Sequence, residues 1–351
     1  MSDTYRVAIV GCGGMGASHA RAWTKKNRVE LVAVADVSQD SADSLGSEFG
    51  IKGYDDYQTM FDQVKPDIVS VTTWQNVRAE ITVAAAAAGV AGILGEKPMA
   101  ASSGESSDMI DACERNSVKL AIGHQRRYMP QNVASRRLVQ AGAIGQPTIM
   151  LRRDGHGLLN RGTHEIDELM FMLGDPTPLW VMGQVGRKTD RWERRVRCED
   201  TCSAIICFDG GVRGVYESDL PEPALLERAT IYGTEGQIRR GEEGSLQLMN
   251  GDQAGWQTIT PPDVTEDQFD EFIDWMDDKV QTHRNNGHQA KITMDIMMAI
   301  YESLRIRDVV ELPLKTRENP LDLLVEDGTL PVVTPGRYDI RAPFPEQEAD
   351  A

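Results

Sequence analysis

The stretch YRVAIVGCGGMG, residues 5–16, decides the fold of this chain. Residues 5–10 form a continuous apolar run, which predicts a strand buried on both faces. The glycines after this run fit the spacing G-x-G-x-x-G. The residues from Gly14 onward have a helical pattern. A strand that turns on such glycines into a helix is typical of dinucleotide-binding sheets, because the turn lets the backbone approach a pyrophosphate and the helix N-terminus attracts it.

Asp36 extends this pattern. It ends the second predicted strand, residues 30–36, about 20 residues beyond the glycine turn, where such a carboxylate accepts hydrogen bonds from a ribose and repels a 2′-phosphate. No arginine or lysine follows it in residues 37–40, so the sequence predicts NAD rather than NADP. A glycine-rich turn without a ligand is the alternative. We interpret Cys12 as a small residue that fits the turn rather than a reactive thiol.

Strands and helices alternate along residues 1–123, which predicts a parallel sheet covered by helices on both faces. The further predicted strands cover residues 67–72, 92–95 and 119–122, and the predicted helices cover residues 14–26, 38–49, 78–88 and 109–116.

The pattern changes after His124, and residues 124–313 predict an α+β domain. Strand-like runs follow one another without helices between them, with turn signals such as Asp209–Gly211, which indicates an antiparallel sheet with helices on one side. The predicted strands cover residues 179–187, 201–208, 212–218 and 228–232, and the predicted helices 129–141, 163–173, 266–283 and 293–308. Residues 314–351 are predicted to form an extended arm that packs on its own or a neighbouring subunit, with a disordered tail as the alternative.

Composition narrows the function classes. The 351 residues carry a net charge of −17, which argues against nucleic-acid binding. The longest apolar stretch, residues 81–94, is shorter than the ~18 residues of a membrane span, so no membrane segment is expected. Cys198 and Cys202 would lie about 13 Å apart along a strand, too far for a disulfide. We expect reduced thiols, a cytoplasmic location and no metal.

Lys97 is the strongest candidate for chemistry. Glu96-Lys97-Pro98 follows the apolar strand at residues 92–95. A lysine ammonium is costly to bury unpaired, and its pKa moves readily on partial desolvation. A lysine at this place can hold or release a proton near neutral pH. A lysine that only forms a salt bridge is the alternative.

Several motifs together resemble the glucose-fructose oxidoreductase / inositol dehydrogenase / MocA (Gfo/Idh/MocA) superfamily over about residues 5–313. The motifs are Gly11–Gly16, Thr73-Trp-Gln-Asn-Val-Arg78, Glu96-Lys97-Pro98, residues 123–130, Gly142-Ala-Ile-Gly145 and Gly162-Thr-His164-Glu-Ile-Asp167. The resemblance implies an N-terminal Rossmann domain, doubly wound, and a C-terminal α+β domain with a large open, mostly antiparallel sheet that forms homodimers or homotetramers. It also implies a site between the domains, in which hydride passes between a carbohydrate or cyclitol hydroxyl and the nicotinamide.

The resemblance also implies residue roles. Lys97 and His164 would be the catalytic acid/base groups, although His164 as a capping or core residue is the alternative. The implied substrate residues are Asn160, Asp167, Arg127, Trp74 and Arg161. The implied cofactor residues are Gly11, Cys12, Gly13, Gly14, Met15, Gly16, Asp36, Val37, Thr72, Thr73, Trp74, Asn76, Glu96 and Lys97. Asp167 follows His164 by three residues and shares its helix face, whereas Glu165 and Glu168 are expected to face water.

Three positions depart from the family pattern. Asn160 replaces an acid that many members carry, and an amide cannot titrate, so the proton chemistry falls on Lys97 and His164. Arg78 stands at a usual histidine, and Trp74 at a proline-like position. These departures leave the substrate open. The sequence does not separate a dehydrogenase from a glycoside-cleaving enzyme that oxidises the sugar transiently, because both use the same cofactor and base. A non-catalytic NAD-binding sensor is a third function, against which the pairing of Lys97 with His164 speaks.

Overall fold

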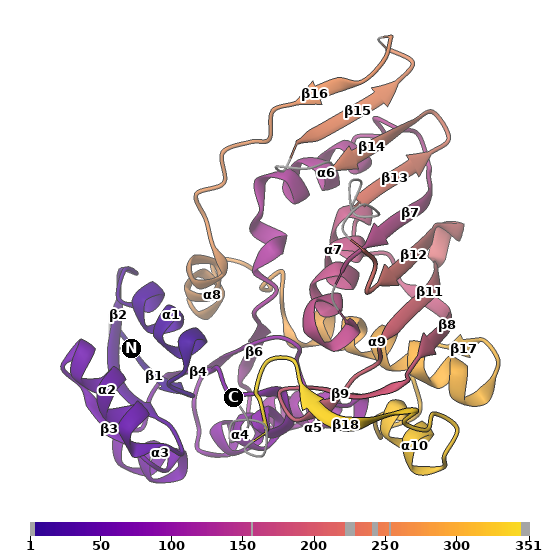
Figure 1. Ribbon diagram of the computed structural model, residues 1–351. Helices are drawn as coiled ribbons and strands as arrows, with labels where there is room; N and C mark the ends of the chain where they lie inside the picture. The colour runs from indigo at the N-terminus through magenta and orange to yellow at the C-terminus, as the bar shows by residue number, and fades with distance from the viewer. Residues whose placement is uncertain (1–3, 156, 222–228, 241–244, 253, 345–351) are drawn as a thin grey trace. The chain divides into compact units, whose positions relative to one another are not determined.

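The computed structural model describes residues 4–155, 157–221, 229–240, 245–252 and 254–344, and the chain forms two compact units (Figure 1). The first unit comprises residues 1–124 and 266–291, and the second comprises residues 125–265 and 292–351. Residues 266–291 depart from the expected division, because the sequence assigned their predicted helix to the second domain. The rings of Phe269 and Phe272 explain the difference: they pack edge-on against Trp23 at 4.9 and 6.1 Å between centroids. The expected limits 1–123, 124–313 and 314–351 otherwise remain a prediction.

A six-stranded parallel sheet forms the core of the first unit, in the order β3-β2-β1-β4-β5-β6. Its strands are β1 (Tyr5–Val10), β2 (Val29–Ala35), β3 (Lys52–Tyr54), β4 (Ile68–Val71), β5 (Gly92–Gly95) and β6 (Lys119–Ile122). The predicted parallel sheet is confirmed. The sequence prediction missed β3, whose three residues carry too short a pattern, and it also missed the eight-residue helix after it.

Helices cover both faces of this sheet because side chains alternate along each strand. The helices are α1 (Gly14–Trp23), α2 (Gln39–Phe49), α3 (Tyr57–Val64), α4 (Gln75–Ala87), α5 (Ser103–Arg115) and α8 (Gln268–Met276). Val7 and Ile9 pack with α1, α2 and α8, whereas Ala8 and Val10 pack with α3, α4 and α5. The strand order reverses between β1 and β4, so the carboxyl edge there is the place where such sheets bind ligands.

A nine-stranded sheet dominates the second unit, in the order β16-β15-β14-β13-β7-β12-β11-β8-β17. Its strands are β7 (Pro147–Arg153), β8 (Pro178–Gly186), β11 (Thr201–Phe208), β12 (Arg213–Ser218), β13 (Ala229–Gly233), β14 (Gly236–Arg240), β15 (Leu246–Asn250), β16 (Gln257–Ile259) and β17 (Val310–Glu311). Neighbouring strands are antiparallel except β7 and β12, which confirms the predicted mostly antiparallel sheet. Exposed and buried side chains alternate along β11, so one face is covered and the other is open.

The remaining elements of the second unit are helical turns, helices and a small sheet. They are η1 (Gln125–Tyr128), α6 (Pro130–Gln140), the π-helical turn η2 (Leu158–Gly162), α7 (Thr163–Leu173), the turn η3 (Asp209–Gly211), α9 (Gly287–Ile306), which begins in the first unit, and α10 (Pro320–Glu326). The small sheet has the order β10-β9-β18 and is built from β9 (Thr189–Glu193), β10 (Val196–Arg197) and β18 (Thr334–Asp339).

The described part of the C-terminal arm packs on its own subunit. Strand β18 lies parallel to β9, and the Asp339 carboxylate accepts hydrogen bonds from the main-chain N–H groups of Arg194 and Arg195 at 3.0 and 2.7 Å. The basic residues 187–197 therefore form a hairpin that the acidic arm caps. Residues 345–351 lie outside the described part.

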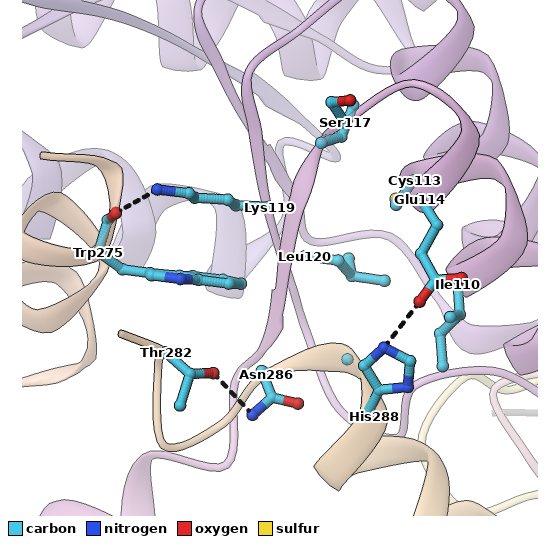
Figure 2. Close-up of a pocket in the computed structure, with 12 residues that line it drawn as sticks. Ile110, Cys113, Glu114, Ser117, Lys119, Leu120, Trp275, Thr282, Asn286 and His288 are labelled. Atoms are coloured by element: carbon cyan, nitrogen blue, oxygen red, sulfur yellow. Dashed lines mark hydrogen bonds and ion pairs between the residues drawn. The ribbon is translucent and has the colours of Figure 1, made fainter. Parts of the chain in front are cut away.

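A cavity of about 500 Å³ lies at the amino end of β6, away from the carboxyl edge (Figure 2). Lys119, Trp275 and His288 are among its lining residues, whereas none of the predicted site residues whose side chains the structure describes lines it. All five cysteines are free thiols. No helix in the described part of the chain has both the length and the apolar character needed to cross a membrane.

Candidate functional site

The glycine turn leaves the first turn of α1 open to an anion. Gly11 has φ +102°, and a Cβ on Gly16 would lie 1.9 Å from the Gly11 carbonyl oxygen, so both glycines are needed for the turn itself. A Cβ on Gly13 or Gly14 would meet nothing within 4 Å. Gly13 caps α1 without a side-chain hydrogen bond, and the first turn holds no acidic residue. The turn therefore fits a pyrophosphate, which the helix N–H groups attract.

Asp36 follows β2 with a fixed orientation. Its Oδ2 accepts a hydrogen bond from the main-chain N–H of Cys12 at 2.7 Å, and its Oδ1 accepts one from Ser38 at 2.9 Å. Each oxygen keeps a further lone pair for a ribose hydroxyl. The neighbouring Val37 is 95% exposed, which leaves an apolar side chain beside the predicted ribose contact. The residues at this edge therefore fit NAD.

Cys12 is a protonated thiol at neutral pH. Burial raises its pKa to about 12, and the charge of Asp36 adds to the shift. This agrees with its interpretation as a small residue of the turn, since the thiolate is the reactive form.

The residues after β4 line the same edge of the sheet. Thr72 Oγ1 lies 2.7 Å from the Gly11 carbonyl oxygen and 3.1 Å from that of Val10, which ties the end of β4 to the glycine turn. Trp74 is 44% exposed and Asn76 is also exposed. Their contacts with the cofactor stay a prediction, as does that of the exposed Met15.

Arg78 is buried and braces two loops of this edge. Its Nη1 donates to the carbonyl oxygen of Pro98 and its Nη2 to that of Thr73. The residue that departs from the family pattern therefore links the loop after β4 to the loop after β5.

Glu96 points into the protein and Lys97 lies half-buried beside it. Glu96 Oε1 lies 3.1 Å from His19 Nε2, and Oε2 accepts a hydrogen bond from the Lys97 main-chain N–H at 3.2 Å. Burial raises the Glu96 pKa, but the hydrogen bond from His19 and the charges of His19, Arg78 and Lys97 outweigh it, so the pKa is lowered. The cofactor contact predicted for Glu96 stays a prediction, and its observed contacts support Lys97. The peptide bond from Lys97 to Pro98 is cis.

The turn η2 leads directly into α7 and orders the second group of predicted residues. His164 is the second residue of α7 and is buried. Arg161 has a partly exposed side chain whose Nε lies 3.3 Å from Asp154 Oδ2. The side chain of Asn160 lies outside the described part of the structure.

Arg127 and Asp167 are paired with each other. Arg127 Nε and Nη2 donate to the two Asp167 oxygens at 2.9 and 2.7 Å, and Arg127 Nη1 lies 2.9 Å from Asp175. Both residues of the pair are 1% exposed. Their contact with substrate stays a prediction, and the buried pair anchors η1 to α7.

Glu165 and Glu168 do not face water, so that expectation was wrong. Both are buried, because arginines from three other elements converge on them. Arg126 Nη1 donates to Glu165 at 2.6 Å and to Glu168 at 3.0 Å, Arg152 pairs with both, and Arg240 Nη1 lies 3.3 Å from Glu168. Burial raises the pKa of Glu165 more than Arg152 lowers it.

Two buried residues were missed by the sequence analysis. His19 lies three residues after Gly16, one helical turn on, and that spacing was a usable signal. Glu199 accepts hydrogen bonds from the Leu158 N–H and the Tyr301 hydroxyl, both at 2.6 Å, and so supports η2. Its partners lie 41 and 102 positions away along the chain, so no local pattern points to it.

Comparisons with known proteins agree with this geometry. The profile of an oxidoreductase family with an NAD-binding Rossmann fold matches residues 5–124, and the profile of the Gfo/Idh/MocA C-terminal domain matches residues 150–239. The match confirms the NAD-binding fold that the glycine turn and Asp36 predicted.

Curated relatives and solved structures cover most of the chain. The D-apiose dehydrogenase of Paraburkholderia graminis is 26% identical over 281 residues, which cover 74% of this chain and 73% of that protein. Inositol 2-dehydrogenase 3 of Saccharopolyspora erythraea is 26% identical over 294 residues, which cover 80% of this chain and 84% of that protein. The WlbA dehydrogenase of Bordetella pertussis, solved with NADH and UDP-GlcNAcA, has a TM-score of 0.75 at 21% identity and covers 89% of this chain and 100% of that one. At that identity the structural likeness shows the fold alone.

Proposed function

This chain belongs to the Gfo/Idh/MocA family of NAD-binding oxidoreductases, and on that premise we propose that it is an NAD-dependent dehydrogenase of a sugar, sugar derivative or cyclitol. The reaction transfers a hydride between a secondary alcohol of the substrate and the nicotinamide. Relatives named for apiose and inositol support a polyhydroxylated substrate.

The observation that most strongly supports the proposal is the position of Lys97 at the carboxyl edge of the sheet, together with the hydrogen bonds that fix the backbone around it. Lys97 is the second residue after β5, at the carboxyl edge that also holds the glycine turn and Asp36. Its main-chain N–H is fixed by a buried carboxylate, and the carbonyl of the next residue is fixed by Arg78. A lysine held in this way at a ligand-binding edge is suited to one defined proton transfer.

The chain's own residues would manage the hydroxyl proton. In the oxidation direction, Lys97 Nζ accepts the proton of the reacting hydroxyl as the C–H bond breaks, and His164 is the second group that holds or relays it. When bound, NAD supplies the hydride acceptor. Asn160, Asp167, Arg127, Arg161 and Trp74 are the proposed substrate contacts, of which Arg161 and Trp74 have exposed side-chain surface to offer.

A cofactor-absorbance screen tests the proposal. The purified protein is incubated with NAD or NADP and with sugars, inositols and glycosides, and the products are identified. We expect NADH formation with at least one polyol or sugar, a preference for NAD, and loss of turnover in Lys97→Ala although this variant still binds NAD. The absence of any NAD- or NADP-linked reaction over a broad panel would contradict the proposal.

The same screen separates the two other functions. Release of a leaving group from a glycoside without net NADH, together with exchange of a sugar C–H for solvent deuterium, would identify the glycoside-cleaving enzyme. NAD binding without turnover of any substrate would identify the sensor. A homodimer or homotetramer formed through the open face of the large sheet, and a cytoplasmic location, remain proposals that light scattering and cell fractionation test.

A further inference from the structure

A buried chain of polar groups lies behind Lys97. Trp23 Nε1 donates to Ser70 Oγ at 2.7 Å, His19 Nδ1 lies 3.1 Å from the same oxygen, and His19 Nε2 lies 3.1 Å from Glu96 Oε1. All four residues are at most 4% exposed. They come from α1, β4 and the end of β5, and we call them the histidine chain.

Hydrogen-bonding roles along the histidine chain follow from its two ends. An indole N–H only donates, so Ser70 Oγ accepts from Trp23 and its own hydroxyl hydrogen is available for His19 Nδ1. An ionised carboxylate only accepts, so His19 Nε2 carries the hydrogen that faces Glu96. A neutral imidazole in the Nε2–H form thus meets both neighbours with complementary groups.

Glu96 connects this chain to the catalytic loop. Its second oxygen accepts the main-chain N–H of Lys97 at 3.2 Å. A Cβ on Gly123 would lie 3.0 Å from Glu96 Oε1, so the neighbouring backbone closes tightly over the carboxylate. The charged or titratable groups that act on Glu96 are His19 from α1, Arg78 from α4 and Lys97 beside it.

We propose that His19 is a positioning residue for the reaction: by donating Nε2–H to Glu96, it holds that carboxylate against the Lys97 main chain and keeps a negative charge behind the Lys97 amine. This inference rests on the proposed function of Lys97. A histidine that merely fills the core would affect stability but not the titration of Lys97.

His19→Phe removes the donor while keeping a ring against Phe269, which the His19 ring meets edge-on at 5.1 Å between centroids. His19→Gln keeps an N–H donor. Phe61→Leu serves as the matched control, because Phe61 is a buried core residue of α3 outside the histidine chain. Glu96→Gln removes the charge itself and keeps the test valid if His19→Phe does not fold.

The decisive measurement uses the protein without cofactor or substrate: the pH dependence of Lys97 acylation, followed by peptide mass spectrometry. In His19→Phe and Glu96→Gln, Lys97 should become reactive at lower pH than in the wild type, because the carboxylate that stabilises its ammonium is weakened or gone. In Phe61→Leu, the pH dependence of Lys97 acylation should equal that of the wild type. In His19→Gln, it should lie close to that of the wild type.

Steady-state kinetics give the second readout. We expect kcat to fall at least about tenfold in His19→Phe, with the KM for NAD nearly unchanged, and to recover in His19→Gln. An unchanged Lys97 titration in His19→Phe, with kcat no lower than in Phe61→Leu, would overturn the inference. If the wild type turns over no substrate, the proposed function fails, but the acylation profile still decides whether His19 acts on Lys97.

Discussion

The two units bury their carboxylates in different ways. In the first unit, Glu96 receives a hydrogen bond from His19 and lies near the Arg78 guanidinium, and the pKa of Glu96 is lowered. In the second unit, two glutamates share three arginines, and burial raises the pKa of one of them. We call this group the ion-pair network; it consists of Arg126, Arg152, Glu165, Glu168 and Arg240.

The contrast indicates where each unit is most sensitive to substitution. Removing one neutral hydrogen-bonding group from a buried site lowers the free energy of unfolding by about 1–3 kcal/mol, because its former partner then has a hydrogen bond to neither protein nor water. Removing one member of a buried ion pair costs about 3–5 kcal/mol, because a whole charge is left uncompensated. The ion-pair network should therefore tolerate single changes less well than the histidine chain.

The largest effect is expected for Arg152→Met. This change takes away the arginine that pairs with both Glu165 and Glu168. The free energy of unfolding should fall by about 3–5 kcal/mol in urea titrations. Arg153→Met is the control, because the next residue of β7 points to the opposite face and should change stability by about 0.5 kcal/mol or less. A loss below about 1 kcal/mol for Arg152→Met would break the comparison.

Ser70→Ala should have the next largest effect. It leaves the buried Trp23 N–H without its acceptor, and we expect a loss of about 1–3 kcal/mol in the same urea titrations. Ser18→Ala, on the exposed side of α1, should change stability by about 0.5 kcal/mol or less. If Ser70→Ala costs as much as Arg152→Met, the two clusters do not differ in the way proposed.

Opposite pH dependences sharpen the comparison further. Burial raises the pKa of Glu199, so its contribution to stability is present below the ordinary glutamate pKa and lost as the pH rises through the folded value. Glu199→Gln should therefore gain stability relative to the wild type with rising pH. The pKa of Glu96 is lowered, so its contribution is present above the ordinary value and lost as the pH falls through the folded one.

Melting temperatures between pH 4 and pH 8 measure both effects. Glu96→Gln should be less stable than the wild type at neutral pH, with a gap that closes in acid, and both effects should be on the order of 1 kcal/mol. The same sign for the two variants would contradict the assigned environments.

The smallest effect is expected for Asp56→Ala, which lies outside both clusters. Asp56 caps α3 by accepting a hydrogen bond from the Thr59 main-chain N–H at 2.7 Å. Removal of this cap should lower the free energy of unfolding by about 1 kcal/mol. The side-chain hydrogen bond from Thr59 lowers the Asp56 pKa, so this stabilisation should disappear as the pH falls through that lowered value. Thermal unfolding at two pH values tests this, and a pH-independent cost would contradict it.

Much of the fold was predictable because its signals are local. The predicted helix 163–173 and strand 201–208 match the observed bounds of α7 and β11, since each has a continuous pattern and clear ends. The short elements β3, β10 and β17 were missed, because two or three residues carry no periodicity. The longer elements α3, β7, β9, β14 and β15 were also missed. The helix α8 was predicted in the wrong unit, since its amphipathic pattern says that it is buried but not against which sheet.

The sequence by itself determined the dinucleotide-binding turn and the position of Lys97 after a strand. Gly11 to Gly16 are consecutive residues of one tight turn, and the contacts that a Cβ would make at Gly11 or Gly16 require glycine at both positions. Only the tertiary structure decided which buried residues contact the side chains next to these positions. Glu96 meets His19 across 77 positions, and Glu168 meets Arg240 across 72, because burial in a folded core selects charge partners by distance in space and not along the chain.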